Sequence, residues 1–259
     1  MLETLIHDGI LELRLARPPV NALDPALVRT LREAVESAPA RGAQALLLSG
    51  QPGMFSAGLD VPALLELDRD AFRVFWADFF GLCAALARSP VPVAAAITGH
   101  SPAGGAVLSI LCDYRVMARG EYRIGLNEVQ VGLLVPECIQ LAFRRLVGVR
   151  EAERLLVTGA MLDPEAAHAV GFVDALADAG TVVDAARDWL QALLQLPPHA
   201  VAATRRFARA DLAALFAEPE RLPVEDFLDG WFAPETQGVL RALVARLKAK
   251  QADTRDHQR

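Results

Sequence analysis

Alternating polar and apolar side chains open the chain. After the Asp8-Gly9 dipeptide, every second residue up to position 15 is a leucine, so the leucines would share one face of an extended strand. Asp-Gly between two alternating segments is a typical two-residue hairpin turn. The pattern predicts a β-hairpin over residues 4–15.

Apolar residues next recur at helical spacing. Asp24 and Pro25 form a typical helix start, a capping carboxylate followed by a proline in the first turn. The apolar positions behind this start are Leu27, Val28, Leu31 and Val35. A longer helix with a broad aromatic face is predicted from about Asp70 to Arg88, where Pro90 ends it.

Short apolar runs without charges alternate with these helices. Ala45–Leu48, Val93–Thr98 and Tyr114–Ala118 are predicted to be buried strands, which indicates an α/β fold with parallel strands. After residue 137 the pattern is helical, apart from a short extended segment at Phe172–Val173. The predicted C-terminal helices are 137–147, 151–158, 164–169, 181–195, 198–209 and 234–250.

Composition and charge narrow the class of protein. With 259 residues, 53% hydrophobic and 22% charged, the chain is typical of a globular protein, and its net charge of −6 argues against nucleic-acid binding. The three cysteines lack metal-ligand spacing, which predicts no metal site and favours a reducing, cytoplasmic location. Acidic residues interrupt the N-terminal segment, and no uncharged apolar run is long enough to span a bilayer, so neither a signal peptide nor a membrane partner is expected.

A glycine-rich turn separates the predicted strand Val93–Thr98 from an apolar helix. Gly99, Gly104 and Gly105 lie within it, and glycine lets a ligand approach the main chain closely. A second loop of small residues, 50–60, also follows a predicted strand. We expect the backbone N–H groups of Ala57 and Gly104 to point at one oxygen that becomes negative during a reaction.

The same turn contains a false match to a hydrolase motif. Gly99-His100-Ser101 resembles the start of a nucleophile elbow, but Pro102 has no N–H to lend to an oxyanion hole, and Ala103 replaces the final glycine. No Lys-Ser/Thr follows the glycines, so the turn is not a phosphate-binding P-loop either. His100 is therefore interpreted as a turn or pocket-wall residue.

Four blocks taken together resemble one family. RPPVNAL, FSAGLD, GHSPAGG with CDYRVMA behind it, and IGLNEVQVGL occur in the order and spacing of the crotonase superfamily, and they are most similar to mitochondrial-type Δ3,Δ2-enoyl-CoA isomerases. The resemblance implies a ClpP-like spiral of ββα units over residues 1–195. It also implies a helical trimerisation region over 196–259, and a homotrimer or a dimer of trimers.

The resemblance further implies an acyl-CoA substrate. Its thioester oxygen would accept hydrogen bonds from Ala57 and Gly104, and the adenine end of CoA would lie near Ser56 to Asp60. CoA belongs to the substrate, so no separate cofactor is expected. The implied substrate-binding residues are Ser56, Gly58, Leu59, Asp60, Gly105 and Asn127.

The reaction depends on which carboxylates reach the acyl chain. Members that hydrate enoyl-CoA resemble one another in carrying two glutamates, and here the first position is Val107. The second position is Glu128, which matches the isomerase's catalytic glutamate. One carboxylate suffices to move a double bond from the 3-position to the 2-trans position, a reaction of fatty-acid β-oxidation, but not for ordinary hydration.

Several alternatives stay open at this stage. Glu137, near the start of a predicted helix, competes with Glu128 for the role of base. Lys248 and Lys250 could reach the CoA phosphates or simply be solvated at a helix end. Asp60 could be a helix cap or loop brace. Hydration, thioester hydrolysis, or a non-catalytic acyl-CoA-binding subunit are the alternative functions.

Overall fold

A six-stranded sheet forms the centre of the computed structural model, which describes residues 1–218, 222 and 224–256, with side chains up to residue 249. Its first two strands pair antiparallel and all others pair parallel, so the predicted hairpin and α/β class are confirmed. In spatial order the strands are β1 (Leu2–His7), β2 (Ile10–Leu15), β3 (Ala45–Ser49), β5 (Val93–Ile97), β7 (Tyr114–Ala118) and β9 (Ala175–Ala177).

Both faces of this sheet are covered. Leu46 and Leu48 of β3 belong to the main apolar core, whereas Ala45 and Leu47 belong to a second cluster that includes residues of α8 (Val182–Leu194). A parallel sheet buried on both sides needs apolar residues at successive positions. This explains why the predicted strands are unbroken apolar runs rather than alternating ones.

A small parallel sheet lies beside the large one and was not predicted. It pairs β4 (Gly53–Met54), β6 (Gly99–Pro102) and β8 (Ile124–Gly125). A Cβ on Gly99 would lie 2.0 Å from the carbonyl carbon of Gly53, so the strands can approach only because residue 99 is glycine. The small sheet brings the loop 50–60 against the glycine-rich turn.

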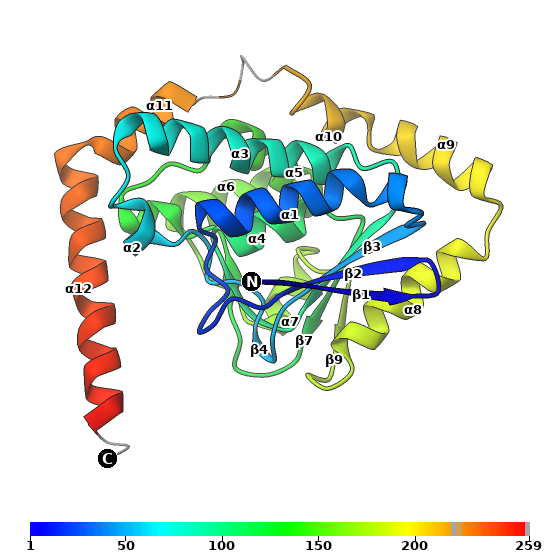
Figure 1. The fold of residues 1–259 in the computed structure, drawn as a ribbon, viewed down its shortest axis with the longest axis horizontal. Coiled ribbons are helices and arrows are strands. Elements are labelled where there is room, and N and C mark those ends of the chain that lie inside the picture. Colours follow the sequence, from blue (N-terminus) through cyan, green and yellow to red (C-terminus); the bar gives the residue numbers. More distant parts are fainter. Residues whose placement is uncertain (219–221, 223, 257–259) are drawn as a thin grey trace.

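The predicted N-terminal helices are confirmed. Asp24 caps α1 (Pro25–Ser37) by accepting a hydrogen bond of 2.8 Å from Leu27 N–H. This helix runs beside α3 (Arg69–Ala87) across the sheet, as Figure 1 shows. The short helices α2 (Val61–Leu64) and α4 (Gly104–Ile110) follow the two loops with small residues.

The C-terminal part is helical, as expected, with three differences. Phe172–Val173 is a turn and the strand β9 comes just after it, so that assignment was wrong. α10 (Ala210–Ala214) and α11 (Val224–Phe232) were not predicted. The other elements are η2 (Glu128–Val131), α5 (Glu137–Val147), α6 (Val149–Thr158), α7 (Pro164–Ala169), α9 (Pro198–Ala208) and α12 (Pro234–Asp256), besides the short η1 (Pro39–Arg41).

The last two helices return to the N-terminal part of the chain. α11 packs on α3, and α12 contacts η2 and α2 (Figure 1). Thr236 Oγ1 also donates a hydrogen bond of 2.9 Å to the carbonyl of Gly132. Residues on both sides of position 195 therefore build one packed unit, and the trimerisation role of 196–259 stays a prediction.

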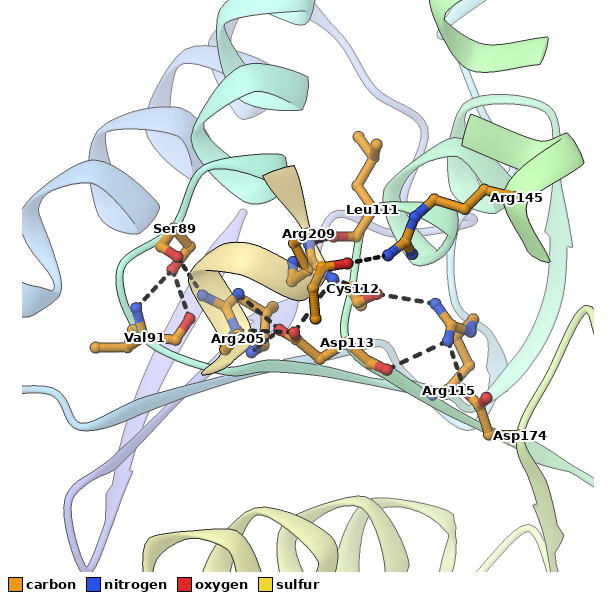
Figure 2. Close-up of polar contacts among 12 residues, drawn as sticks. Ser89, Val91, Leu111, Cys112, Asp113, Arg115, Arg145, Asp174, Arg205 and Arg209 are labelled. Carbon is orange, nitrogen blue, oxygen red and sulfur yellow. Dashed lines mark hydrogen bonds and ion pairs between the residues drawn. The ribbon is translucent and has the colours of Figure 1, made fainter. Parts of the chain in front are cut away.

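A buried ion cluster ties α9 and α10 to the sheet (Figure 2). Asp113 accepts two hydrogen bonds of 2.8 Å from the Arg205 guanidinium, and it also accepts one of 2.8 Å from Val93 N–H. Arg209 lies 3.2 Å from the same carboxylate. Asp113 is thus a structural acid that joins the C-terminal helices to the start of β5.

Among 1–218, 222 and 224–256, no helix is both long and apolar enough to cross a bilayer. Nor does that part of the chain bring three or more His, Cys, Asp or Glu side chains together in a way that could hold a metal ion.

Candidate active site

A cavity of about 160 Å³ lies where the two loops meet. Its walls come from the loop after β4, the start of α4, η2 with the following loop, and the helices α3, α5, α11 and α12. Its lining is mostly apolar and consists of Ala57, Leu59, Val61, Trp76, Phe79, Pro102, Ala103, Gly104, Val107, Asn127, Glu128, Val131, Leu133, Leu134, Pro136, Ile139, Phe227 and Leu243.

The predicted role of Ala57 as an N–H donor is wrong. Its N–H donates a hydrogen bond of 2.9 Å to the carbonyl of Val20 and so is not free for a ligand. Ala57 does line the cavity, but as an apolar contact.

Leu59 supplies the N–H that Ala57 cannot. Leu23 pairs with the carbonyl of Gly58 and the N–H of Asp60, and in such a parallel bridge the N–H of the residue between them faces the opposite side. No acceptor for the Leu59 N–H is found among the residues that the structure describes. A Cβ on Gly104 would lie 3.5 Å from the Leu59 nitrogen, so the two residues are close neighbours.

The N–H of Gly104, the other predicted donor, also has no acceptor among the described residues. Gly104 is the first residue of α4, where a helix has no internal acceptor for the N–H. Ala103 before it has a φ of +46° and donates to the carbonyl of Gly125 at 2.8 Å. This left-handed conformation, rare for a residue with a side chain, fixes the turn from which Gly104 points into the cavity.

Glu128 lines the cavity at the start of η2. Its Oε2 atom is buried and has no hydrogen-bond partner within the described residues. Burial raises the pKa of Glu128 to about 7, because transfer from water disfavours the charged carboxylate. Asn127 beside it also lines the cavity and has a buried, unpaired Oδ1. A carboxyl group in this state can both accept and return a proton near neutral pH.

Glu128 is the one carboxylate among the described lining residues. Val107, one turn into α4, contributes an apolar surface that is 3% exposed. Glu137 is exposed on the first turn of α5 and does not line the cavity, although its neighbours Pro136 and Ile139 do. The geometry therefore separates the two candidate bases and favours Glu128.

Three residues expected to bind substrate are instead buried inside the loop packing. Ser56 is fully buried, donates to the carbonyl of Asn21 at 2.8 Å and accepts from Gly58 N–H at 3.2 Å. A Cβ on Gly105 would lie 2.6 Å from the carbonyl oxygen of Ser56. Ser56, Gly58 and Gly105 thus shape the donor loop and do not line the cavity. Sequence reasoning missed this because it could not tell which loop atoms pack against one another.

Asp60 is a brace rather than a ligand contact in this structure. It caps α2 by accepting a hydrogen bond of 3.0 Å from Ala63 N–H, and it lies 2.7 Å from the Arg17 guanidinium. Arg17 also pairs with Asp24 at 3.0 Å. The alternative interpretation of Asp60 as a cap or loop brace is confirmed.

His100, Ser101 and Lys248 are not among the residues that line the cavity. His100 accepts a hydrogen bond of 3.2 Å from Arg123 N–H, and Ser101 is fully buried, so neither is placed as a catalyst. Lys248 is exposed on α12. The side chain of Lys250 lies outside the described residues.

Known proteins with similar sequences point to one family. The sequence pattern of the enoyl-CoA hydratase/isomerase family matches residues 6–225. The chain is 31% identical over 256 residues to mitochondrial enoyl-CoA delta isomerase 1 of Mus musculus, covering 97% of this chain and 88% of the relative. It is 32% identical over 220 residues to a probable enoyl-CoA hydratase of Mycolicibacterium paratuberculosis, covering 84% of each.

A solved structure extends the likeness to three dimensions. The crystal structure of human mitochondrial delta3-delta2-enoyl-CoA isomerase superimposes with a TM-score of 0.91 at 28% identity, covering 96% of this chain and 98% of the other. The predicted crotonase fold is therefore confirmed. The chain belongs to the enoyl-CoA hydratase/isomerase family.

Proposed function

We propose that the protein moves the double bond of a 3-enoyl-CoA to the 2-trans position. One observation carries the proposal: among the described residues that line the cavity, Glu128 has the only carboxyl group, and it shares the cavity with Leu59 and Gly104, whose N–H groups have no acceptor in the described part of the chain. This set supplies one acid/base group and one oxyanion site, which is what a double-bond shift through an enolate requires.

The proposed reaction has two proton transfers. With the thioester oxygen between Leu59 and Gly104, the Glu128 carboxylate removes a proton from C2, and the electron pair moves onto the thioester oxygen as an enolate. The protonated Glu128 carboxyl then donates the same proton to C4. The electrons of the C3–C4 double bond form the new C4–H bond, the enolate electrons form the C2–C3 double bond, and the thioester carbonyl is restored. Each N–H donor is worth about 3 kcal/mol of transition-state stabilisation.

The relatives support both isomerase and hydratase as candidates, and the cavity wall favours the first. Adding water to a 2-enoyl-CoA requires groups that hold and deprotonate the water molecule, and the side chain that α4 contributes to the cavity lining is that of Val107. An apolar side chain there can neither accept nor donate a proton. Ordinary hydration is therefore the second candidate, and it rests on the relatives named as hydratases.

The deciding experiment compares two substrates on the same protein. Isomerisation of a 3-enoyl-CoA is followed by the absorbance of the conjugated product, and water addition to a 2-enoyl-CoA by loss of that absorbance. We expect isomerisation to dominate, and Glu128→Gln to abolish it while acyl-CoA still binds. Robust hydration by the parent protein would refute the argument from Val107.

The matched control is Glu137→Gln, which removes an exposed carboxyl group close to the cavity. We expect a mild effect on isomerisation. If this variant is inactive and Glu128→Gln is active, the base has been assigned to the wrong residue. If no enoyl-CoA is converted although acyl-CoA binds, the protein is a non-catalytic binding subunit.

Family membership also supports proposals on the partners. We propose that CoA is part of the substrate, that no separate cofactor is used, and that residues 196–259 join subunits into a homotrimer or a dimer of trimers. The proposed cytoplasmic location rests instead on the three free cysteines, which fit a reducing compartment. Sedimentation measurements would test the assembly.

A further inference from the structure

The acyl cavity, defined by the lining residues given above, has a buried end and an open side. Trp76 and Phe79 of α3, Ile139 of α5 and Phe227 of α11 are each at most 3% exposed. Leu134, by contrast, is 42% exposed. An acyl chain that enters past the exposed residues would therefore end against α3 and α11.

Two aromatic rings close the buried end. The rings of Trp76 and Phe227 stack with their centroids 3.7 Å apart and their planes 14° apart. This is van der Waals contact, so no methylene can pass between them. The stack comes from helices far apart in sequence, and it would form only where α11 lies on α3.

The wall is supported from behind. Phe72 stacks on Trp231 with centroids 4.4 Å apart and so fills the space behind Phe227. On the outer surface, Glu225 of α11 forms ion pairs with two arginines of α3, Arg69 at 3.1 Å and Arg73 at 2.8 Å. These ion pairs hold α11 against α3. An aromatic wall packed in this way resists displacement by a longer ligand, because close-packed cores yield little space.

The volume sets the length of chain that fits. A cavity of about 160 Å³ is close to the roughly 150 Å³ apolar cavity that holds benzene, a molecule of six carbons. Resting on the proposed function, we infer that the protein acts on short acyl chains of about six carbons, and that Trp76 and Phe227 set this upper limit. Dodecenoyl chains would have to displace the aromatic stack.

Substrate competition tests this inference directly. We expect kcat/KM for 3-hexenoyl-CoA to exceed that for 3-dodecenoyl-CoA by at least about 100-fold, since even two methylenes that do not fit a filled pocket cost about tenfold or more each. Trp76→Leu and Phe227→Leu enlarge the buried end, and each should reduce this ratio by about tenfold. Equal kcat/KM values for the two substrates in the parent protein would overturn the inference.

The control variant is Phe143→Leu, which trims a buried aromatic residue of α5 that packs on Phe172 and does not line the cavity. Its hexenoyl-to-dodecenoyl ratio should equal that of the parent. A fall in the ratio equal to that of the Trp76→Leu variant would show that general loosening, not the wall, sets the preference.

Binding of saturated chains separates this inference from the proposed reaction. Calorimetry with hexanoyl-CoA and dodecanoyl-CoA measures the fit of the chain without any double-bond shift. Tighter binding of hexanoyl-CoA by a protein that isomerises nothing would uphold the length limit and refute the reaction. Equal or tighter binding of dodecanoyl-CoA would refute the length limit, whatever the reaction.

Discussion

Replacing Glu128 by glutamine should stabilise the protein at high pH while inactivating it. The folded protein raises the pKa of this carboxyl from 4.5 to about 7, so the folded state binds the proton more tightly than the unfolded state. As the pH rises from 4.5 to 7, the unfolded protein releases this proton more readily than the folded protein does. The free energy of unfolding therefore decreases over this range. A shift of this size corresponds to about 3 kcal/mol, at 1.36 kcal/mol per pKa unit.

The assay is urea unfolding of parent and variant at equal protein concentration, at pH 5 and at pH 8. The variant cannot ionise, so the free-energy difference between the two proteins should grow by about 2 to 3 kcal/mol in its favour between these pH values. Other titrating groups cancel in this comparison. Activity should fall by about a thousandfold, the usual worth of an acid/base group.

A control and a refuting result follow from the same design. Glu137→Gln is the control, because it makes the same chemical change at an exposed position outside the cavity. If the free-energy difference between the parent and Glu128→Gln changes no more with pH than the difference between the parent and Glu137→Gln, the Glu128 carboxyl is not held uncompensated in an apolar cavity. The reasoning that makes it the acid/base group would then be wrong.

Three further results are expected. Because the base form of Glu128 is lost below its raised pKa, kcat/KM should fall about tenfold per pH unit below about pH 7 and level off above it, as a pH-rate profile would show. Val107→Glu places a second carboxylate in the cavity, so mutual repulsion should move the midpoint of that profile upward, whereas Val107→Gln should not. Asp113→Asn leaves the buried guanidinium of Arg209 without its counter-charge and should lower the free energy of unfolding by about 3 kcal/mol. Asp211→Asn breaks only an exposed ion pair, so its urea midpoint should stay above that of Asp113→Asn.

Much of the fold follows from local sequence patterns. Asp24 and Pro25 predict the start of α1, and apolar runs predict β3, β5 and β7, because caps and burial act over a few residues. The small sheet β4-β6-β8 could not be predicted in this way. Its strands are two to four residues long, and they exist because Gly99 lets Gly53 approach, a contact between distant segments.

The candidate site shows the same division. Glu128 and Gly104 could be chosen from their motifs, but Leu59 could not. Ala57 and Leu59 lie two residues apart in the same loop, and no sequence pattern shows which of their N–H groups is free. The carbonyl of Val20 decides between them, because it takes the N–H of Ala57, and no local pattern predicts that hydrogen bond.

The position of Phe227 and Leu243 in the cavity has a consequence for synthesis. Translation proceeds from the N-terminus, so Leu59, Gly104 and Glu128 leave the ribosome well before the helices that complete the acyl wall. Until residues beyond 224 have emerged, Trp76 and Phe79 of α3 would face water as an open apolar surface. A growing chain therefore contains its proposed catalytic residues before the cavity around them is complete. The last helices cover the apolar surface and, if the proposed length limit holds, also determine which acyl chains fit.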